Sequence, residues 1–267
     1  MNPLPVRPFV PLEALVAPTT LQSVEKFVLD NYVHTSTIRG IELSWLCLSR
    51  RLLWMAVGQE YIEPELLDWI DAMHPSSVLY DIGASNGIFA MYAAARGADV
   101  FAFEPDPSNY FLLSYNNYLN SSRGKTGIKA CMNFAISSKM EIGMINIRNM
   151  ELGSHEKILD NSVDVFGNAF SPAHTHAVLK CRIDDLKCIL KSKDPTHIKI
   201  DVDGSEIEVL RGANQVLKSA KSIFIELTDM ASGQAAHSLL SEKGFHLVSR
   251  HQVQNYEGLH NCIYEKD

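Results

Sequence analysis

The sequence predicts an α/β fold with a Rossmann-like sheet of seven strands, helices on both faces, and an N-terminal arm and helical cap. From residue 78 onward, short apolar runs alternate with helical patterns, as in a mainly parallel sheet. A glycine turn joins the first of these runs directly to a helix start. The chain has 267 residues and is 46% hydrophobic, which is enough for one large core.

Residues 1–75 are expected to form the arm and the helical cap. Five prolines within residues 1–18 predict an extended arm, because proline lacks an amide donor and restricts the residue before it. A helix is expected over 19–32, a buried hairpin or helix over 41–57, and another helix from Pro64. A contact between subunits through this region, or contact of 41–57 with a membrane surface, is the alternative reading.

Residues 76–267 are assigned to one α/β domain. The expected strands are 77–82, 99–103, 128–136, 197–202, 222–227, about 245–250 and about 260–264. The expected helices are 86–96, 106–119, 184–192, 205–217 and 232–243. Residues 138–180 interrupt this alternation, since they are rich in Asn, Ser, His and Gly. We predict an insertion there, because long segments of this kind in compact domains are usually functional or mobile.

The glycine turn after the first strand of the sheet is the expected cofactor site. The apolar run ends in Asp81-Ile82, and Gly83-Ala84-Ser85-Asn86-Gly87 follows. Glycine lets the backbone bend sharply and approach a ligand closely. Glu104 closes the next strand, 21 residues after Gly83, where an acid binds ribose hydroxyls. The pattern predicts a cofactor that resembles a nucleotide.

The sequence of this turn differs at Ser85 from that of a dinucleotide site, which prefers G-x-G-x-x-G. Here the middle glycine is missing. Asp81 would repel phosphates and attract the ammonium and sulfonium groups of S-adenosyl-L-methionine, which is therefore the predicted cofactor. A nicotinamide-dependent oxidoreductase is the alternative, and the glycine turn of another doubly wound domain also explains this stretch alone.

Asp201 and Asp203 are the candidate catalytic residues, with Asp201 also a candidate for donor binding. Ligands of open parallel sheets bind outside the carboxyl ends of the strands, so both should face the cleft of Gly83. In an extended run the two side chains share one face. One could then hold the ammonium of the donor while the other meets the acceptor. Alternatively, residues 203–205 only turn the chain and cap the helix that follows.

Three histidines lie in the irregular segment: His155, His174 and His176. His174 and His176 could act as base or bind the acceptor, although solvated loop histidines are commoner. Imidazoles at this spacing can also suggest a metal, but no feature of the sequence supplies a third ligand. We therefore expect no metal.

Composition narrows the partners and the compartment. A net charge of −7 gives no basic face for a nucleic acid. Five widely spaced cysteines form no C-x-x-C pair, which favours reduced thiols. No apolar run reaches the roughly 18 residues of a membrane span, and the start lacks a signal-peptide core. We expect a cytoplasmic protein without a membrane span.

Several motifs, in order along the chain, resemble those of the FkbM family of S-adenosylmethionine-dependent methyltransferases, a branch of the class I methyltransferase fold. The segment 198–213, IKIDVDGSEIEVLRGA, is similar to the family signature K-I-D-V-E-G-x-E-x-x-V-L-x-G-A, with Asp203 in place of glutamate. The likeness covers roughly residues 58–265. The other matching motifs are the turn at Asp81-Ile82-Gly83-Ala84 with Gly87, Phe103-Glu104-Pro105-Asp106-Pro107, the helix end with Leu113, Asn116 and Asn120, and Ile183-Asp184-Asp185-Leu186.

The resemblance implies methyl transfer to a hydroxyl of a small molecule, sugar or secondary metabolite. Phe134-Ala135 would bracket the adenine, Glu63 would lie near the amino-acid end of the donor, and Glu226 could line the acceptor pocket. Residues 138–180 would lie on the acceptor side. A donor-binding module without turnover is the remaining alternative. The expected donor-binding residues are Glu63, Asp81, Gly83, Ala84, Ser85, Gly87, Glu104, Pro105, Phe134, Ala135 and Asp201.

Overall fold

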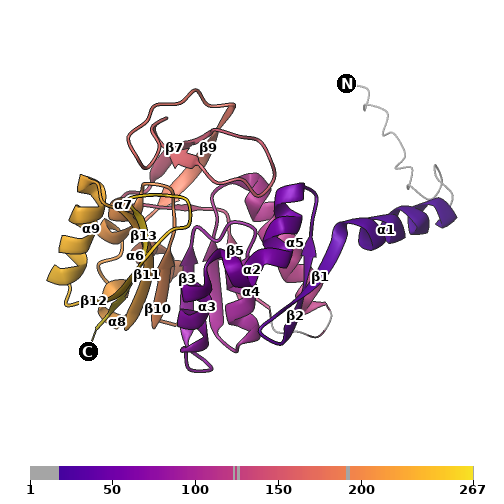
Figure 1. Ribbon diagram of the computed structural model, residues 1–267, viewed down its shortest axis with the longest axis horizontal. Helices are drawn as coiled ribbons and strands as arrows, with labels where there is room; N and C mark the ends of the chain where they lie inside the picture. The colour runs from indigo at the N-terminus through magenta and orange to yellow at the C-terminus, as the bar shows by residue number, and fades with distance from the viewer. Residues whose placement is uncertain (1–17, 123, 125–126, 191–192, 267) are drawn as a thin grey trace, which may run out of the picture.

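The computed structural model describes residues 18–122, 124, 127–190 and 193–266, so the expected proline-rich arm lies outside the described residues apart from Pro18. One sheet of seven strands forms the centre of the described chain (Figure 1), which confirms the predicted fold class. Its order is β12-β13-β11-β10-β3-β4-β5, and β13 runs antiparallel to both of its neighbours. The strands are β3 (Val78–Ile82), β4 (Asp99–Phe103), β5 (Ala130–Met132), β10 (His197–Ile200), β11 (Ser222–Thr228), β12 (His246–Gln252) and β13 (Leu259–Glu265).

Helices cover both faces of this sheet, as predicted. The two largest apolar clusters lie on opposite faces, one against α3 (Pro64–Asp71) and α4 and the other against α7, α8 and α9. The predicted helix 205–217 is wrong as one element, because it divides at Gly212. A Cβ at Gly212 would lie 2.0 Å from the carbonyl oxygen of Ser137, so the backbones approach too closely for a side chain. The helices are α4 (Ile88–Ala95), α5 (Pro107–Ser121), α6 (Ile183–Leu190), α7 (Glu206–Arg211), α8 (Val216–Ser219) and α9 (Ala231–Glu242).

The N-terminal part of the described chain is a helix, a hairpin and two further helices. Figure 1 shows α1 projecting away from the rest of the molecule. The segment 41–57 contains both structures that the sequence left open, since β2 is followed by α2, which Ser49 caps by accepting from the Leu52 amide. The elements are α1 (Pro18–Tyr32), β1 (Val33–Ile38), β2 (Ile41–Leu46), α2 (Arg50–Ile62) and α3 (Pro64–Asp71).

Two buried asparagines of α5 fix the hairpin to the main domain. Asn116 Oδ1 accepts from the Leu46 amide at 2.8 Å, and Asn116 Nδ2 donates to the carbonyl of Asn86 at 2.8 Å. Asn120 binds both backbone groups of Ser44, at 3.0 and 2.9 Å. Side-chain amides can pair with a strand edge in this way because they carry both a donor and an acceptor. The family-like asparagines therefore position the cap beside the cofactor turn.

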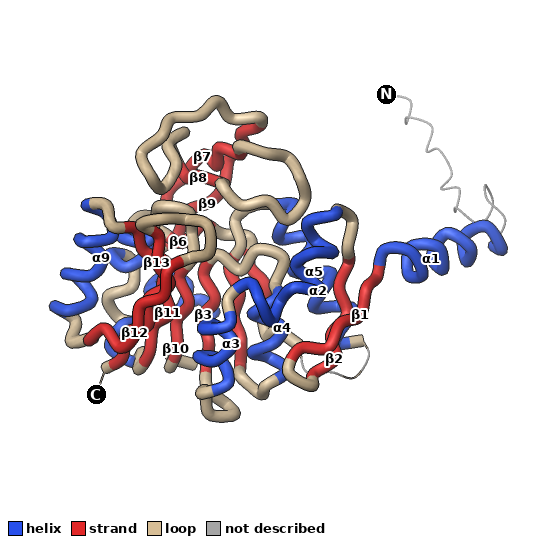
Figure 2. Tube along the Cα trace, in the orientation of Figure 1, coloured by secondary structure: helices blue, strands red, loops and turns tan. Residues whose placement is uncertain are grey.

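Residues 138–180 contain strands that the sequence analysis did not predict. β6 (Ala135–Ile136), β7 (Glu141–Ile147), β8 (Lys157–Leu159) and β9 (His174–Cys181) form a second sheet in the order β6-β9-β7-β8 (Figure 2). The predicted strand 128–136 is wrong as one element, because it divides between β5 and β6. Asn133 Nδ2 donates to the carbonyls of Glu104 and Pro105, both at 2.9 Å, where the chain leaves the main sheet.

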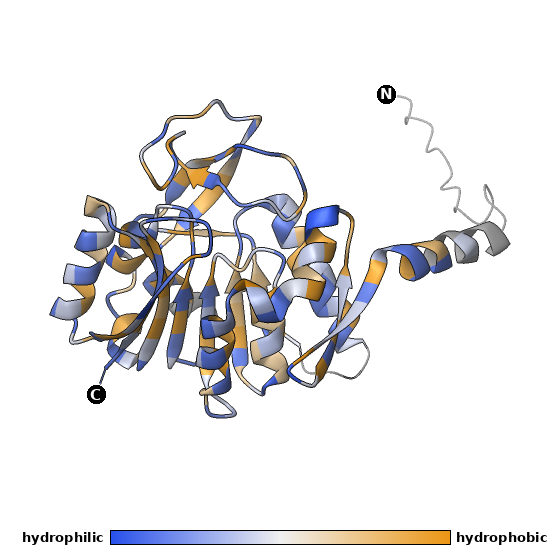
Figure 3. Ribbon diagram, in the orientation of Figure 1, coloured by the Kyte–Doolittle hydropathy of each residue, from blue (hydrophilic) through white to orange (hydrophobic). Residues whose placement is uncertain are grey.

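The second sheet has a small apolar core of its own. Ala135, Ile145, Ile147 and Val178 are buried together, and apolar residues appear in orange along these strands in Figure 3. The sheet lies above the ends of the main strands in Figure 1. It therefore carries the segment between β7 and β9 toward the carboxyl edge of the main sheet.

Candidate active site

A pocket of about 450 Å³ lies at the carboxyl ends of β3, β4, β10 and β11, within the size range of small-molecule sites. Gly87 is the one predicted site residue that does not line it. Gly87 instead packs on α5, where an added Cβ would lie 2.6 Å from Leu113 Cδ1. The predicted residues that do line the pocket are Glu63, Asp81, Gly83, Ala84, Ser85, Glu104, Pro105, Phe134, Ala135, Asp201 and Asp203.

Gly83 brings the end of β3 against the end of β10. Its φ is +81°, and a Cβ built there would lie 1.7 Å from the carbonyl oxygen of Asp201. The Gly83 and Ala84 amides both donate to the carbonyl of Phe103, at 2.9 and 3.0 Å. The turn is thus held between β4 and β10, which only a residue without a side chain allows.

Glu104 receives a backbone hydrogen bond on each carboxyl oxygen. The Ser85 amide donates to Oε2 and the Asp106 amide to Oε1, both at 2.8 Å. Burial nevertheless raises the pKa of Glu104 to about 7, against the opposing pull of the Asp106 amide and the Lys157 ammonium. Each oxygen keeps a second lone pair, so the ionised carboxylate can still accept from hydroxyl groups.

A buried lysine of β10 joins three parts of the site. Lys199 Nζ donates to Asp201 Oδ2 at 3.1 Å and to the Gly83 carbonyl at 3.2 Å, and it lies 3.3 Å from Asp81 Oδ1. Burial would lower the pKa of Lys199, but Asp201, Asp81 and Glu63 outweigh burial and raise it. Lys199 therefore remains a cation and fixes two of the predicted donor-binding carboxylates.

More carboxyl groups surround Lys199 than its single positive charge can neutralise. Burial is the main cause that raises the pKa of Glu63 to about 8, and the Asp201 carboxylate adds to the increase. Burial also raises the pKa of Asp81 despite the neighbouring ammonium. An additional cation in the pocket would lower these raised pKa values, because an opposite charge favours the ionised carboxylate.

Two residues that line the pocket each have a buried amide oxygen without a donor among the described residues. They are Asn86 Oδ1 and Asn109 Oδ1, on side chains that are 4% and 3% exposed. Buried polar atoms are normally paired, so both oxygens are suited to a ligand with N–H or O–H groups. S-adenosylmethionine carries ammonium, ribose hydroxyl and adenine amino donors, and the residues present fit it.

Residues 152–158 form a strap across the pocket between α2 and the end of β10. At the α2 side, Ser49 Oγ donates to the Leu152 carbonyl at 2.9 Å and Arg51 Nε to the Gly153 carbonyl at 2.7 Å. At the other side, the Glu156 and Lys157 amides donate to Asp203 Oδ2, at 3.0 and 3.2 Å. The strap is therefore attached at both ends to elements that line the pocket.

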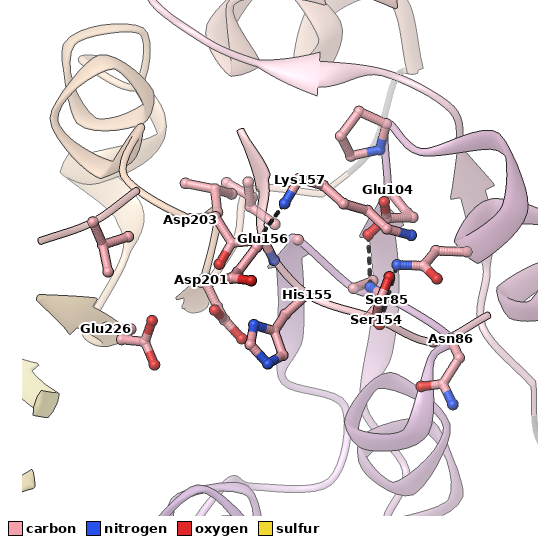
Figure 4. Close-up of a pocket in the computed structure, with 18 of the residues that line it drawn as sticks. Ser85, Asn86, Glu104, Ser154, His155, Glu156, Lys157, Asp201, Asp203 and Glu226 are labelled. Atoms are coloured by element: carbon pink, nitrogen blue, oxygen red, sulfur yellow. Dashed lines mark hydrogen bonds between the residues drawn. The ribbon is translucent and has the colours of Figure 1, made fainter. Parts of the chain in front are cut away.

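Lys157 connects the strap to the Glu104 turn. Its Nζ lies 2.7 Å from Asp106 Oδ1, and both side chains are buried. Burial would raise the pKa of Asp106, but Lys157 outweighs burial and holds it below its usual value. Figure 4 shows Lys157 and Glu104 on the same side of the pocket.

The expectation that Asp201 and Asp203 share one face of a strand is wrong. β10 ends at Ile200, and Asp203 has a φ of +49° in a turn with Gly204. The carboxylate of Asp203 binds the strap, while that of Asp201 binds Lys199. Ser205 also makes no side-chain cap to α7, so capping does not account for the turn.

His155 is the histidine of the insertion that lines the pocket, whereas His174 and His176 lie in β9 and do not line it. Its Nε2 lies 3.4 Å from the Tyr256 hydroxyl. Tyr256 in turn stacks on Phe166, with ring centroids 6.2 Å apart and an angle of 4° between the planes. Figure 4 shows His155 projecting into the pocket beside Asp201, with Glu226 farther along the same wall.

Sequence reasoning missed Lys199, Asn86, Asn109 and Lys157 as site residues. The first lies in the family-like signature, and a lysine at the carboxyl end of a buried strand was the available signal. Asn86 lies in the glycine turn itself. No local signal identified Lys157, because its partner Asp106 is 51 residues away in the chain.

The strand order and the site geometry define a class I methyltransferase fold. Magnesium protoporphyrin IX methyltransferase (ChlM) from Synechocystis, solved with bound S-adenosylmethionine, superimposes with a TM-score of 0.50 at 9% identity, over 82% of this chain and 85% of that one. Methyltransferase FkbM from Methylobacillus flagellatus aligns with a TM-score of 0.49 at 16% identity, over 73% of this chain and 45% of that longer chain.

Residues 81–247 match the sequence model of the Methyltransferase FkbM domain, so the chain belongs to the FkbM family of methyltransferases. Hexuronic acid methyltransferase AglP from Haloferax volcanii is 24% identical over 80% of this chain and 78% of its own length. Methyltransferase sdnD from Sordaria araneosa is 24% identical over 64% of this chain and 74% of its own. The family confirms the predicted class of enzyme, a methyltransferase, and does not support the oxidoreductase alternative.

Two kinds of feature are absent from the described residues. No group of three or more His, Cys, Asp or Glu side chains there is arranged to hold a metal ion. No helix in the described ranges is both long and apolar enough to cross a membrane.

Proposed function

We propose that this enzyme transfers a methyl group from S-adenosylmethionine to a hydroxyl oxygen of a small metabolite or sugar. The proposal rests on the arrangement of one pocket. One part of it holds more carboxyl groups around Lys199 than that lysine can neutralise, and a separate wall is formed by the strap and β11. The donor, when bound, supplies an electrophilic methyl group on a positively charged sulfur. The two relatives named as methyltransferases support the reaction class.

The donor side would be formed by the predicted residues together with those that the structure adds. Glu104 would accept the ribose hydroxyls on its remaining lone pairs, and Asn109 is adjacent, since its Nδ2 donates to Ser85 Oγ at 3.4 Å. Asp201, Asp81 and Glu63 would attract the ammonium group. Phe134 and Ala135 would contact the adenine. Holding both reactants in a near-attack geometry contributes about 7–11 kcal/mol to such reactions.

The acceptor side would be formed by the strap, β11 and the loop before β13. Asp203 and Glu226 line it, and burial raises the pKa of both carboxyls. A carboxylate on the acceptor would meet like charge there, which costs binding energy. Arg51 lines the pocket at the opposite, α2 side, 6.0 Å from the Trp54 ring. We therefore infer a neutral or cationic hydroxyl compound, in contrast to the hexuronic acid in the name of the Haloferax relative.

Other features of the chain bear on its partners and its compartment. The exposed Phe27, Leu29 and Tyr32 of the projecting α1 support a contact between two copies of the chain through the N-terminal region, and light scattering on the purified protein would test it. The free cysteines at 47, 131, 181 and 262 support a cytoplasmic location. The net charge of −7 argues against a nucleic acid as acceptor.

Thermal unfolding with ligands tests the donor assignment. S-adenosylhomocysteine should raise the melting temperature of the wild-type protein, because a ligand that binds only the folded state stabilises it. NAD should not. The Glu104→Ala variant should lose most of the response to S-adenosylhomocysteine while its ligand-free protein remains folded. Stabilisation by NAD alone would contradict the proposal.

A further inference from the structure

His155 makes a longer hydrogen bond than the carboxylates of Glu104, Asp201 and Asp203, which line the same pocket. Each oxygen of Glu104 receives an amide, Asp201 binds Lys199, and Asp203 binds two amides of the strap. The carboxyl groups of these three residues are therefore already engaged by donors of the protein. Among the residues that the structure describes, the ring of His155 has one hydrogen-bond partner, the Tyr256 hydroxyl, at 3.4 Å from Nε2.

The backbone on both sides of His155 is fixed. Ser154 Oγ donates to the Asn149 carbonyl at 2.8 Å, and the Glu156 amide donates to Asp203 Oδ2 at 3.0 Å. The side chain between them is exposed in the open pocket and projects toward Asp201 (Figure 4). The strap thus presents one imidazole at a defined place above the end of β10.

Acidic side chains are the most frequent charged groups that face His155. Asp201 and Asp203 come from the end of β10, Glu226 from β11 and Tyr256 from the C-terminal loop, while Glu156 and Lys157 flank it on the strap. The two charged neighbours on the strap are already paired, Glu156 with Arg148 at 2.6 Å and Lys157 with Asp106 at 2.7 Å. Negative charge therefore dominates around the ring.

We propose that His155 is the general base that removes the proton from the acceptor hydroxyl. With Nε2–H donating to the Tyr256 oxygen, Nδ1 carries the lone pair that takes the proton. As the O–H bond breaks, the acceptor oxygen forms a bond to the methyl carbon and the carbon–sulfur bond breaks toward sulfur. The products are a methyl ether, S-adenosylhomocysteine and an imidazolium ion, which returns its proton to solvent. This inference rests on the proposed O-methyl transfer.

Glu226 is the alternative base, since it lines the same wall and no described residue forms a hydrogen bond or ion pair with it. Burial, together with Asp201 and Asp203, raises its pKa well above the usual value. The raised pKa means that less of the ionised carboxylate, the form that could accept a proton, is present. Glu226 instead fits a role in binding the acceptor.

A first test uses the His155→Gln variant, with His174→Gln as the matched control from β9. Initial rates would be measured with methyl glycosides of neutral and amino hexoses as acceptor probes. We expect kcat to fall about 10²–10⁴-fold, with the affinity for S-adenosylhomocysteine unchanged by calorimetry. The acidic limb of the kcat–pH profile should disappear, and added imidazole should partly restore His155→Ala. A larger loss in Glu226→Gln, with the limb retained in His155→Gln, would overturn the proposal.

A second test needs no acceptor. Nitrogen-15 NMR of histidine-labelled protein with S-adenosylhomocysteine reports which ring nitrogen of His155 carries hydrogen. The proposal requires the neutral tautomer with hydrogen on Nε2, and a neutral ring protonated on Nδ1 would overturn it. If the wild-type enzyme methylates none of the probes, the proposed function is in doubt, whereas the tautomer still reports on His155 itself.

Discussion

The proposed donor side and the proposed acceptor side of the pocket are built in different ways. On the donor side, Gly83, Ser85 and Glu104 lie in two adjacent turns of the main sheet, where the Gly83 amide donates to the Phe103 carbonyl and the Ser85 amide to the Glu104 carboxylate. On the acceptor side, the strap is fixed by side chains that are far away in the chain, such as Asp203 at 47 residues from Glu156 and Arg51 at 102 residues from Gly153. The difference suggests that donor binding depends on backbone shape, whereas acceptor binding depends on a few polar contacts.

Gly83→Ala should produce the largest effect, because it changes the backbone of the donor side. The new Cβ would lie 1.7 Å from the Asp201 carbonyl oxygen, so β3 and β10 would have to separate. We expect affinity for S-adenosylhomocysteine to fall at least about 100-fold, roughly 2.7 kcal/mol, as measured by calorimetry. Gly97→Ala is the matched control, since Gly97 also has positive φ but its Cβ would meet Pro75 at an ordinary 3.6 Å. If both variants lost affinity for S-adenosylhomocysteine equally, the loss would come from backbone strain and not from the contact with Asp201.

Asp203→Gly tests the acceptor side with the backbone preserved, because glycine adopts the positive φ of residue 203 without strain. It removes the acceptor of the Glu156 and Lys157 amides and should release one end of the strap. We expect kcat/KM for the acceptor to fall about 10- to 100-fold, or roughly 1.4–2.7 kcal/mol, since each lost hydrogen bond costs about 0.5–1.5 kcal/mol.

Asp203→Asn is the matched control for that variant, because asparagine tolerates positive φ and keeps an oxygen that can accept from both amides. Its kcat/KM should stay within about threefold of wild type, or about 0.7 kcal/mol. Donor affinity should change little in either variant. A loss of donor affinity as large as the loss of kcat/KM would show that the two sides are not independent.

The pH dependence of donor binding should give the smallest effect. Burial raises the pKa of Glu104 to about 7 in the ligand-free protein, and the ionised form is the better acceptor for ribose hydroxyls. Affinity should therefore weaken as the pH falls, by about fourfold from roughly pH 8 to pH 6.5, and Glu104→Gln should remove this dependence. Without ligand the sign is opposite, because a carboxyl with a raised pKa stabilises the fold when protonated, so this contribution is lost as the pH rises through about 7.

The sequence was sufficient for the main sheet because its strands are short buried runs bounded by turns. It also predicted that Gly83 and Glu104 lie near each other, as they do in the pocket, since adjacent parallel strands place their carboxyl ends side by side. The second sheet was missed because β7, with the sequence EIGMINI, alternates buried and exposed residues between long polar stretches. Asp203 was misplaced because β10 ends before it and its turn depends on contacts with the strap.

The contacts of Lys199 and Lys157 illustrate the same limit. The lysine in the signature lies at a strand end, so its neighbours Asp81 and Gly83 follow from the sheet register. Lys157 reaches Asp106 only because the second sheet folds back over the pocket. Local patterns cannot specify such a pair before the path of the insertion is known.

The chemical structure of the product is the most direct test of methyl transfer to a hydroxyl oxygen. S-adenosylmethionine with a carbon-13 methyl group would be incubated with the enzyme and the panel of hexose glycosides, and the product would be examined by NMR. We expect a labelled methyl carbon bonded to oxygen, with neutral or amino glycosides preferred over uronic acids. Label on nitrogen or carbon, or transfer only to a uronic acid, would contradict it.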